Sequence, residues 1–350
     1  MFDKGERRGL FMKTSKINIT IGIILAIAVI SAVVAILYNA QNTGKKTTIG
    51  DVFKYDLTEF AKTDPNLIKY KEIGKIKTNL QNASAIAIDS ENRIYVAGDK
   101  LIRVFNDKGD KLSEIKLSDN ATCLTIADNR NIYVAVKDHI EIYNQQGRQI
   151  SKWNSIGENA VITSVAVYND NVFIADAVGK IVQRYDTKGR LKNVIGKRNP
   201  DKGISGFIIP SPYFDLLVAN DGLLRVVNPG NHKIETYNFD GDLISSWGET
   251  SIEIKGFSGC CNPVNIAILP NGKFVTCEKG IPRVKIYNEK GEFESVVAGA
   301  ESFANTVGIH NTMLCNEDST KALDIAVDSR GRIFVLDPAE KTIRIFISKS

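Results

Sequence analysis

The stretch IAIDSENRIYVAGDKLIRVFNDKG, residues 86–109, decides the fold because five related stretches follow it along the chain. Each copy opens with a short apolar segment, passes through a polar turn into a second and a third apolar segment, and most copies then reach a turn that contains glycine. One apolar position sets the register, at Ile86, Leu124, Val165, Leu216, Ile266 and Ile325. Such self-similarity indicates one supersecondary unit that is used six times.

Within the first copy, IAID (86–89), RIYVA (93–97) and LIRVF (101–105) have the composition and length of β-strands. A tight turn and a fourth strand follow. The turn recurs as NDKGD, NQQGR, DTKGR, NFDGD and NEKGE, with glycine where a hairpin needs a residue that tolerates positive φ. Four short antiparallel strands per copy predict an all-β, six-bladed β-propeller.

The sixth copy contains its third strand, TIRIF (342–346), but no fourth strand follows before Ser350. Residues 68–76, IKYKEIGKI, precede the first copy and have strand character. A strand from this region would complete the last blade and remove an exposed sheet edge. We therefore predict that an N-terminal strand closes the last blade.

Residues 19–38 carry no charge, and about 20 apolar residues suffice to cross a bilayer as a helix. The preceding flank is positive, which favours a cytoplasmic N-terminus. We expect a cytoplasmic tail at 1–17, a transmembrane helix at 18–38, a linker at 39–66 and an extracytoplasmic propeller at 67–350. The alternative is a cleaved signal peptide, but the apolar run is longer than is usual for one.

The composition narrows the range of functions. The formal net charge is only +5 over 350 residues, and no basic run interleaved with aromatics indicates a nucleic-acid surface. The three histidines, His139, His232 and His310, lie outside the predicted innermost strands, and no Gly-x-Ser-x-Gly motif or phosphate-binding loop occurs. These absences disfavour a three-histidine metal centre, nucleophilic hydrolysis and phosphoryl transfer.

The connections from each turn glycine to the next blade grow to 27, 25 and 34 residues in the second half of the chain. In a propeller these connections share one face, and function usually resides on loops that a rigid scaffold holds. All five cysteines are expected on this face, at positions 123, 260, 261, 277 and 315. A protein or small-ligand partner is therefore expected there.

Two interpretations of the cysteines remain open. Disulfides form outside the cytoplasm, so a bond between Cys315 and either Cys260 or Cys261 would hold two long loops together. In this interpretation Cys123 and Cys277 are small core residues. Alternatively, Cys260, Cys261 and Cys315, with Cys277, form a thiolate-bound metal or iron–sulfur site, although no Cys-x-x-Cys motif supports one.

Two further groups of residues are candidate ligand-binding sites. Asp215, Asn265 and Asp324 precede the register position in blades four to six, so their oxygens could converge on the channel and hold Ca²⁺, or simply cap the innermost strands. In EKGIPRVKIY (278–287), the charges lie close together and form either a solvated edge or a docking patch for an acidic partner; they are Glu278, Lys279, Arg283 and Lys285.

IAIDSENRIYVA (86–97), IAVDSRGRIFVLD and the aromatic end of each third strand resemble the NHL-repeat family of β-propellers over residues 68–350. The segments GCCNP and EKGIPRVKIY look like those of membrane-anchored bacterial members. Blades three and four depart from the pattern, and Asn228 replaces the usual aspartate. The resemblance implies a binding platform, while some propeller relatives are lyases or lactonases. The lyases' histidine ligands have no counterpart here, and a lactonase-like cation site would have to use Asp215, Asn265 and Asp324.

We therefore expect a single-pass protein of the cytoplasmic membrane of a prokaryote, whose extracytoplasmic propeller binds a protein or ligand and is not expected to be an enzyme. A metal or redox component of a membrane electron-transfer system is the first alternative. A cation-dependent, lactonase-like hydrolase is the second.

Overall fold

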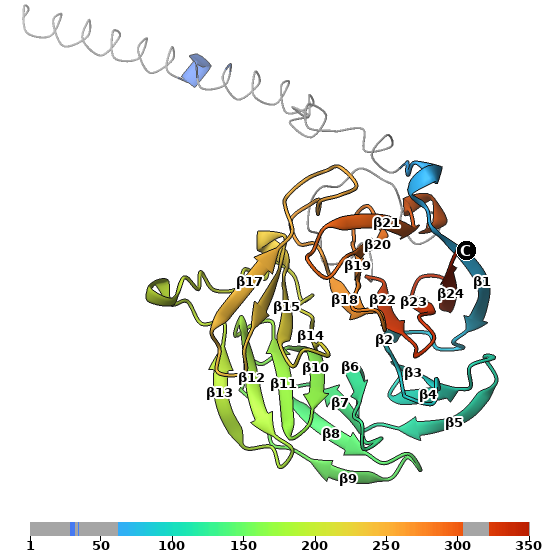
Figure 1. Ribbon diagram of the computed structural model, residues 1–350. Coiled ribbons are helices and arrows are strands. Elements are labelled where there is room, and N and C mark those ends of the chain that lie inside the picture. The colour runs from blue at the N-terminus through green and yellow to red at the C-terminus, as the bar shows by residue number, and fades with distance from the viewer. Residues whose placement is uncertain (1–28, 32–33, 35–61, 304–321, 350) are drawn as a thin grey trace, which may run out of the picture. The chain divides into compact units, whose positions relative to one another are not determined.

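The computed structural model describes residues 29–31, 34, 62–303 and 322–349. Contacts divide the chain into two units, Met1–Tyr55 and Asp56–Ser350. The second unit contains six four-stranded antiparallel sheets arranged around a common axis (Figure 1). The predicted six-bladed β-propeller is confirmed.

The strands follow the same order in every blade, from the innermost to the outermost. Blades one to three comprise β2 (Ala83–Ile88), β3 (Ile94–Gly98), β4 (Leu101–Phe105) and β5 (Lys111–Lys116); β6 (Ala121–Ile126), β7 (Ile132–Val136), β8 (His139–Tyr143) and β9 (Gln149–Lys152); β10 (Ile162–Tyr168), β11 (Asn171–Asp176), β12 (Ile181–Asp186) and β13 (Leu191–Ile195). Blades four to six comprise β14 (Leu216–Val218), β15 (Leu224–Asn228), β16 (Lys233–Tyr237) and β17 (Leu243–Trp247); β18 (Asn265–Ile268), β19 (Phe274–Cys277), β20 (Val284–Tyr287) and β21 (Phe293–Ala298); β22 (Asp324–Val327), β23 (Ile333–Asp337), β24 (Thr342–Ser348) and β1 (Tyr70–Lys77). Short 3₁₀ turns lie at η1 (Pro65–Leu67), η2 (Pro200–Lys202), η3 (Pro229–Asn231) and η4 (Ala300–Phe303).

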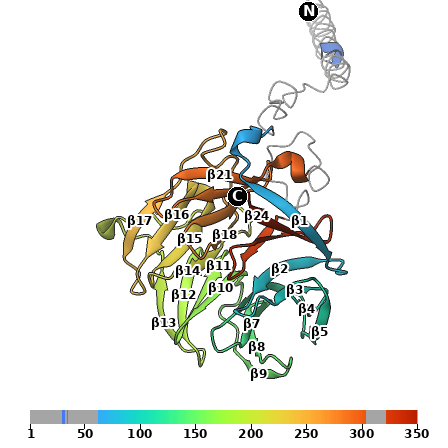
Figure 2. The same cartoon turned by 45° about the vertical axis from the view of Figure 1, so that its right-hand side comes forward.

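The last blade is closed by the N-terminal strand, as the sequence predicts. β1 pairs antiparallel with β24, from Tyr70 opposite Ser348 to Lys77 opposite Thr342. Figure 2 shows β1 running beside β24 near the C-terminal end of the chain. This pairing joins the two ends of the propeller, so the blades form a closed ring without a missing edge strand.

The core is divided among the interfaces between blades. The innermost strands β2, β6, β10, β14, β18 and β22 contact one another in sequence, and β22 contacts β2 to complete the circle. A cluster of buried apolar side chains fills each of the six interfaces. Each blade therefore buries its faces only against its neighbours, which is why a single repeat cannot fold alone.

The recurrent turn glycine serves the packing between blades as well as the turn. Gly291 has a φ of +81°, and a Cβ there would lie 2.2 Å from Trp247 in the preceding blade. Gly109 has a φ of +92°, and its Cβ would lie 2.7 Å from Ile76 of β1. Glycine is thus required both by the turn and by the close approach of a neighbouring side chain.

The predicted membrane helix at 18–38 lies outside the described residues except for 29–31 and 34, which are helical. Within the parts of the chain that the structure describes, no helix is long and apolar enough to cross a bilayer. Most of the predicted linker and all of the predicted cytoplasmic tail also fall outside the described part.

Candidate functional site

The three channel residues predicted from the sequence bond to neighbouring blades. Oδ2 of Asp215 accepts a hydrogen bond from the backbone N–H of Ile266 at 2.8 Å, and its Oδ1 accepts one from Ser164 Oγ at 2.6 Å. Asp215 therefore joins blade four to blades three and five.

Asp324 and Asn265 act in the same way. Asp324 Oδ2 accepts from the N–H of Ile86 at 2.8 Å, which joins blade six to blade one. Asn265 Nδ2 donates to the carbonyl of Leu323 at 2.6 Å, which joins blade five to blade six. In the structure these side chains bond neighbouring backbone, as the capping interpretation predicts. No set of three or more histidine, cysteine, aspartate or glutamate side chains suited to a metal occurs in the described part of the chain.

The two channel carboxyls are nevertheless unusual in their acidity. Burial raises the pKa of Asp215 to about 6. Burial, together with the negative charge of Asp215, raises the pKa of Asp324 to about 7. Both carboxyls therefore favour the protonated form more than an exposed aspartate does.

Two of the five cysteines are core thiols near the innermost ring. Cys123 and Cys277 are free and buried, and burial raises the pKa of both thiols. Cys277 Sγ donates to the carbonyl of Leu323 at 3.3 Å. Buried thiols of raised pKa are poor nucleophiles and poor metal ligands, which suits the interpretation of these two residues as small core side chains.

The adjacent cysteines of the loop before β18 differ from each other. Cys260 is in a disulfide bond, whereas Cys261 is a free thiol that is only 1% exposed. Their sulfur atoms lie 3.2 Å apart. A sulfur in a disulfide is not a thiolate ligand, so the metal hypothesis lacks one of its predicted ligands in this state. Cys315 lies outside the described residues.

The charges of the segment 278–287 are buried, so neither a solvated edge nor a docking patch describes Glu278, Arg283 and Lys285. All three side chains are at most 1% exposed. Arg283 Nη2 contacts Glu278 Oε2 at 2.8 Å, and Lys285 Nζ contacts Glu278 Oε1 at 2.7 Å. We call these three residues the Glu278 cluster. The prediction of exposed charges was wrong because the loop from 248 to 264 covers this edge of blade five.

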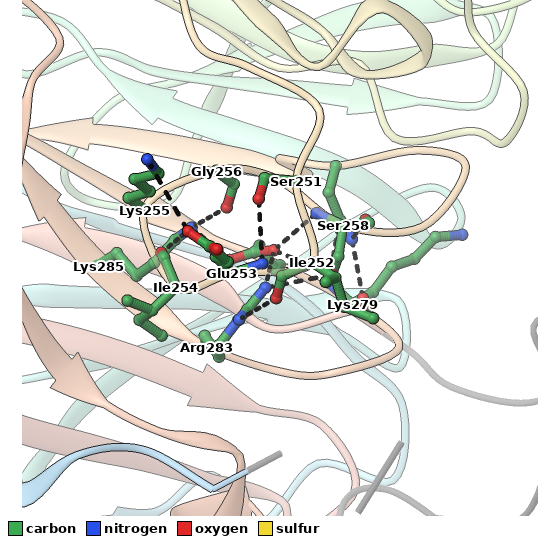
Figure 3. A network of polar contacts seen from close by, with 12 residues as sticks. Ser251, Ile252, Glu253, Ile254, Lys255, Gly256, Ser258, Lys279, Arg283 and Lys285 are labelled. Carbon is green, nitrogen blue, oxygen red and sulfur yellow. Dashed lines mark hydrogen bonds and ion pairs between the residues drawn. The ribbon is translucent and has the colours of Figure 1, made fainter. Parts of the chain in front are cut away.

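The Glu278 cluster holds that loop by its backbone. Lys285 Nζ donates to the carbonyls of Ile254 at 3.0 Å and Gly256 at 2.6 Å. Figure 3 shows Lys285 and Arg283 directed into the loop formed by residues 251–258. The Lys285 ammonium also lies 4.6 Å from the ring centre of Phe257, a cation–π contact that strengthens with desolvation. Burial lowers the pKa of Lys285 to about 8, although Glu278 opposes this shift.

Lys279 is the predicted docking residue that remains partly exposed. Its Nζ donates to Ser211 Oγ at 3.1 Å and lies 4.7 Å from the ring centre of Tyr213. Its backbone N–H donates to Asn262 Oδ1 at 2.8 Å. Lys279 thus connects the loop before β14 with the loop before β18.

Sequence reasoning missed a polar position in the middle of the third strand, which is buried in blades two to six and half-buried at Arg103 of blade one. In three blades a hydrogen-bond acceptor occupies this position, and the tyrosine two residues later donates a hydrogen bond to it: Tyr143 to Glu141 at 2.7 Å, Tyr237 to Glu235 at 2.6 Å, and Tyr185 to Gln183. In blade six, Arg344 occupies this position and Phe346 follows two residues later. The Arg344 guanidinium lies 5.5 Å from the centre of the Phe346 ring. Alignment of the six copies at this position would have revealed the pairing, since residues i and i+2 share a face of a strand.

No protein-family model and no curated protein matches this chain. Among solved structures, the chain is similar to virginiamycin B lyase from Staphylococcus aureus, with 14% identity, a TM-score of 0.54 and coverage of 80% of this chain and 100% of that one. It is also similar to a streptogramin B lyase, with 11% identity, a TM-score of 0.53 and coverage of 80% and 98%. A protein of unknown function from Bacteroides thetaiotaomicron aligns with 14% identity, a TM-score of 0.56 and coverage of 83% and 74%.

These comparisons support the propeller fold, and at such identities they carry no statement about the reaction. The particular NHL-repeat family is not confirmed by them.

Proposed function

We propose that the protein is a membrane-anchored, extracytoplasmic binding platform whose binding surface is the face that carries the long connections. Residues 196–215 and 248–264 define the described part of this long-loop face. The observation that supports the proposal best is the Glu278 cluster, because three fully buried charged side chains are used to fix the backbone of a surface loop.

Fixing a loop in advance favours binding. A loop that must become ordered when a partner arrives loses conformational entropy, and that loss reduces affinity. The Glu278 cluster, together with Tyr287, orders residues 251–258 in the absence of a partner, because Lys285, Arg283 and Tyr287 bind carbonyls of this loop. The scaffold therefore presents the exposed side chains of this loop in a constant arrangement.

The exposed side chains of the long-loop face suit a polar macromolecular partner. Glu249, Glu253 and Lys255 are exposed on one loop, and Lys197 and Arg198 are exposed on the other. Charges of both signs on loops of fixed shape provide orientation and selectivity more than raw affinity. We propose a protein partner in the cell envelope.

Site-specific photo-crosslinking in the producing cells tests this proposal. A photoreactive phenylalanine analogue that replaces Glu253 is expected to give a discrete crosslinked species. The same analogue in place of Lys108, an exposed residue in a turn of the opposite face, is expected to give none. Adding Lys285→Met, which frees the loop, should reduce the Glu253 product. Equal products from both faces, or none from Glu253, would contradict the proposal.

A second candidate is a cation site in the channel, of the kind that a lactonase-like hydrolase would use. It is supported by the placement of Asp215, Asn265 and Asp324 at the start of the innermost strands of three consecutive blades, since side-chain oxygens are the ligands that Ca²⁺ takes in proteins. Calorimetric titration with Ca²⁺ should give near-stoichiometric heat that Asp324→Asn abolishes. No heat above dilution for the unmodified protein would remove this candidate.

A further inference from the structure

A small hollow lies at the outer edge of the propeller, between blades two and three. Its volume is about 210 Å³, which is below the range of about 300–1,000 Å³ for pockets of drug-sized ligands. Its walls are the segment that follows β9, Tyr185 of β12 and the turn after β12. The hollow therefore has room for a molecule of about the size of one sugar ring.

The hollow exists because the connection that would cover this place is short. Trp153 and Trp247 both pack against the turn glycine of the next blade. At Trp247, Phe257 of a long connection packs against the indole ring, with ring centres 6.3 Å apart. The connection from β9 to β10 ends at residue 161, and residues 154–161 contain no aromatic side chain. Trp153 is therefore left at the wall of an open space.

Trp153 provides an aromatic wall and a donor without an acceptor. The residue is 7% exposed, and its ring centre lies 5.5 Å from that of Tyr185 and 6.5 Å from that of Tyr133. Nε1 of Trp153 is buried and has no hydrogen-bond acceptor within the part of the chain that the structure describes. Such donors are uncommon and cost free energy. A ligand oxygen in the hollow would supply the acceptor after a small movement of the indole ring.

The charge of the lining selects an anion. The residues that line the hollow include two lysines and no carboxylate. Lys152 Nζ lies 3.6 Å from Glu141 Oε1, so its charge is partly balanced, whereas Lys188 is exposed. The turn that contains Lys188 is held in place, because its backbone N–H donates to Asp186 Oδ1 at 3.0 Å. A carboxylate can accept charge-assisted hydrogen bonds from both ammonium groups.

We propose that this hollow binds a single uronic acid, which is a sugar ring with a carboxylate. The two lysines bind the carboxylate, and the ring lies against the aromatic wall. The hydroxyl groups exchange hydrogen bonds with the polar side chains of the lining, which are Ser151, Asn154 and Ser155. None of these residues belongs to the long-loop face, so the site is independent of the proposed binding platform.

Tryptophan fluorescence tests the proposal, because Trp153 and Trp247 are the two tryptophans of the chain. The full chain with Trp247→Phe reports on Trp153 alone, and it is purified without sugar-based detergents. We expect a saturable change in emission with D-glucuronate or D-galacturonate, and none with glucose, which lacks the carboxylate, or acetate, which lacks the ring. Lys188→Met should weaken binding about ten-fold, since one hydrogen bond to a charged group is lost. Lys108→Met, at the equivalent turn position of blade one, should leave binding unchanged.

The proposal is overturned if neither uronic acid gives a saturable change, or if glucose or acetate gives the same change. It is also overturned if Lys188→Met and Lys108→Met bind the uronic acid equally well. Calorimetric titration of the unmodified protein and of the two lysine variants makes the same comparison without Trp247→Phe, so the test does not depend on the folding of that variant. A cooperative unfolding transition identifies the variants that retain the fold.

Discussion

Replacing Lys285 by methionine is expected to destabilise the protein by about 3 kcal/mol. Methionine has a similar length and fills the same space, but it removes the ammonium. The ion pair with Glu278 Oε1 at 2.7 Å is lost, and the carbonyls of Ile254 and Gly256 lose their donor. Buried polar atoms without partners are costly, so the folded state loses free energy at all three acceptors.

The magnitude follows from two opposing effects. Removing one member of a buried ion pair costs about 3–5 kcal/mol. The lower end applies here because Arg283 still contacts Glu278 Oε2 at 2.8 Å. The lowered pKa of Lys285, about 8, also shows that burying its charge is unfavourable, and methionine avoids that desolvation.

Lys273→Met is the matched control, because it removes a lysine from the same blade. Lys273 Nζ contacts Glu294 Oε2 at 2.5 Å, but both side chains are about one-third exposed, and such surface pairs contribute under about 1 kcal/mol. Denaturant unfolding can be followed by the fluorescence of Trp247, whose ring centre lies 4.9 Å from that of Tyr287. If Lys285→Met unfolds at the same denaturant concentration as Lys273→Met, the reasoning is refuted.

Local opening gives an independent measure of the same perturbation. Lys255 is exposed on the loop that the Glu278 cluster holds, and trypsin cleaves there only when the loop opens. A loss of 3 kcal/mol confined to this loop would raise the open population about 100-fold. Unchanged cleavage at Lys255 in Lys285→Met would show that the cluster does not hold the loop.

Three other predictions concern the channel, the turns and the anchor. The pKa of Asp324 is about 7 in the folded protein and lies near 3.8 when the chain is unfolded. The folded state therefore binds more protons between these two values, so the free energy of unfolding should fall as the pH rises from about 4 to 7. Urea denaturation measured across this pH range should show a smaller fall in the free energy of unfolding for Asp324→Asn than for the unmodified protein. A Cβ at Gly291 would lie 2.2 Å from Trp247, whereas a Cβ at Gly203, which also has positive φ, would have no atom within 4 Å. Gly291→Ala should therefore lower the free energy of unfolding by about 2 kcal/mol more than Gly203→Ala does. In cell fractionation, the full chain should resist alkaline extraction from membranes and a chain without residues 1–38 should not.

The fold was predictable because its determinants are local and repeated. Strands with alternating apolar residues and a glycine in the third turn recur in five copies, so each copy supports the interpretation of the others. Closure by the N-terminal strand was predicted from the missing fourth strand of the last copy. The observed strand spans Tyr70–Lys77 instead of 68–76, with a register shift between Glu72 and Gly74, a bulge that strand propensity alone does not reveal.

The environment of the candidate site was not predictable in the same way. Arg283, just before β20, and Lys285, within β20, alternate with apolar residues, which is normally the pattern of a solvated edge. They are buried because a loop some thirty residues earlier in the chain covers them, and no local pattern encodes that contact. For Asp215 and Asp324 the sequence placed the residues on the innermost strands, but only the structure shows that backbone donors of adjacent blades bind their carboxyl oxygens.

Amide hydrogen exchange of residues 249–258 in the unmodified protein and in Lys285→Met tests most directly whether the long-loop face is fixed in advance of binding. The N–H groups of Ser251 and Phe257 donate to carbonyls within the loop at 3.0 and 2.9 Å, so they should exchange far more slowly than in an unstructured peptide. Lys285→Met should remove most of that protection. Exchange at the rate of an unstructured peptide in the unmodified protein would contradict the account of a preformed binding platform.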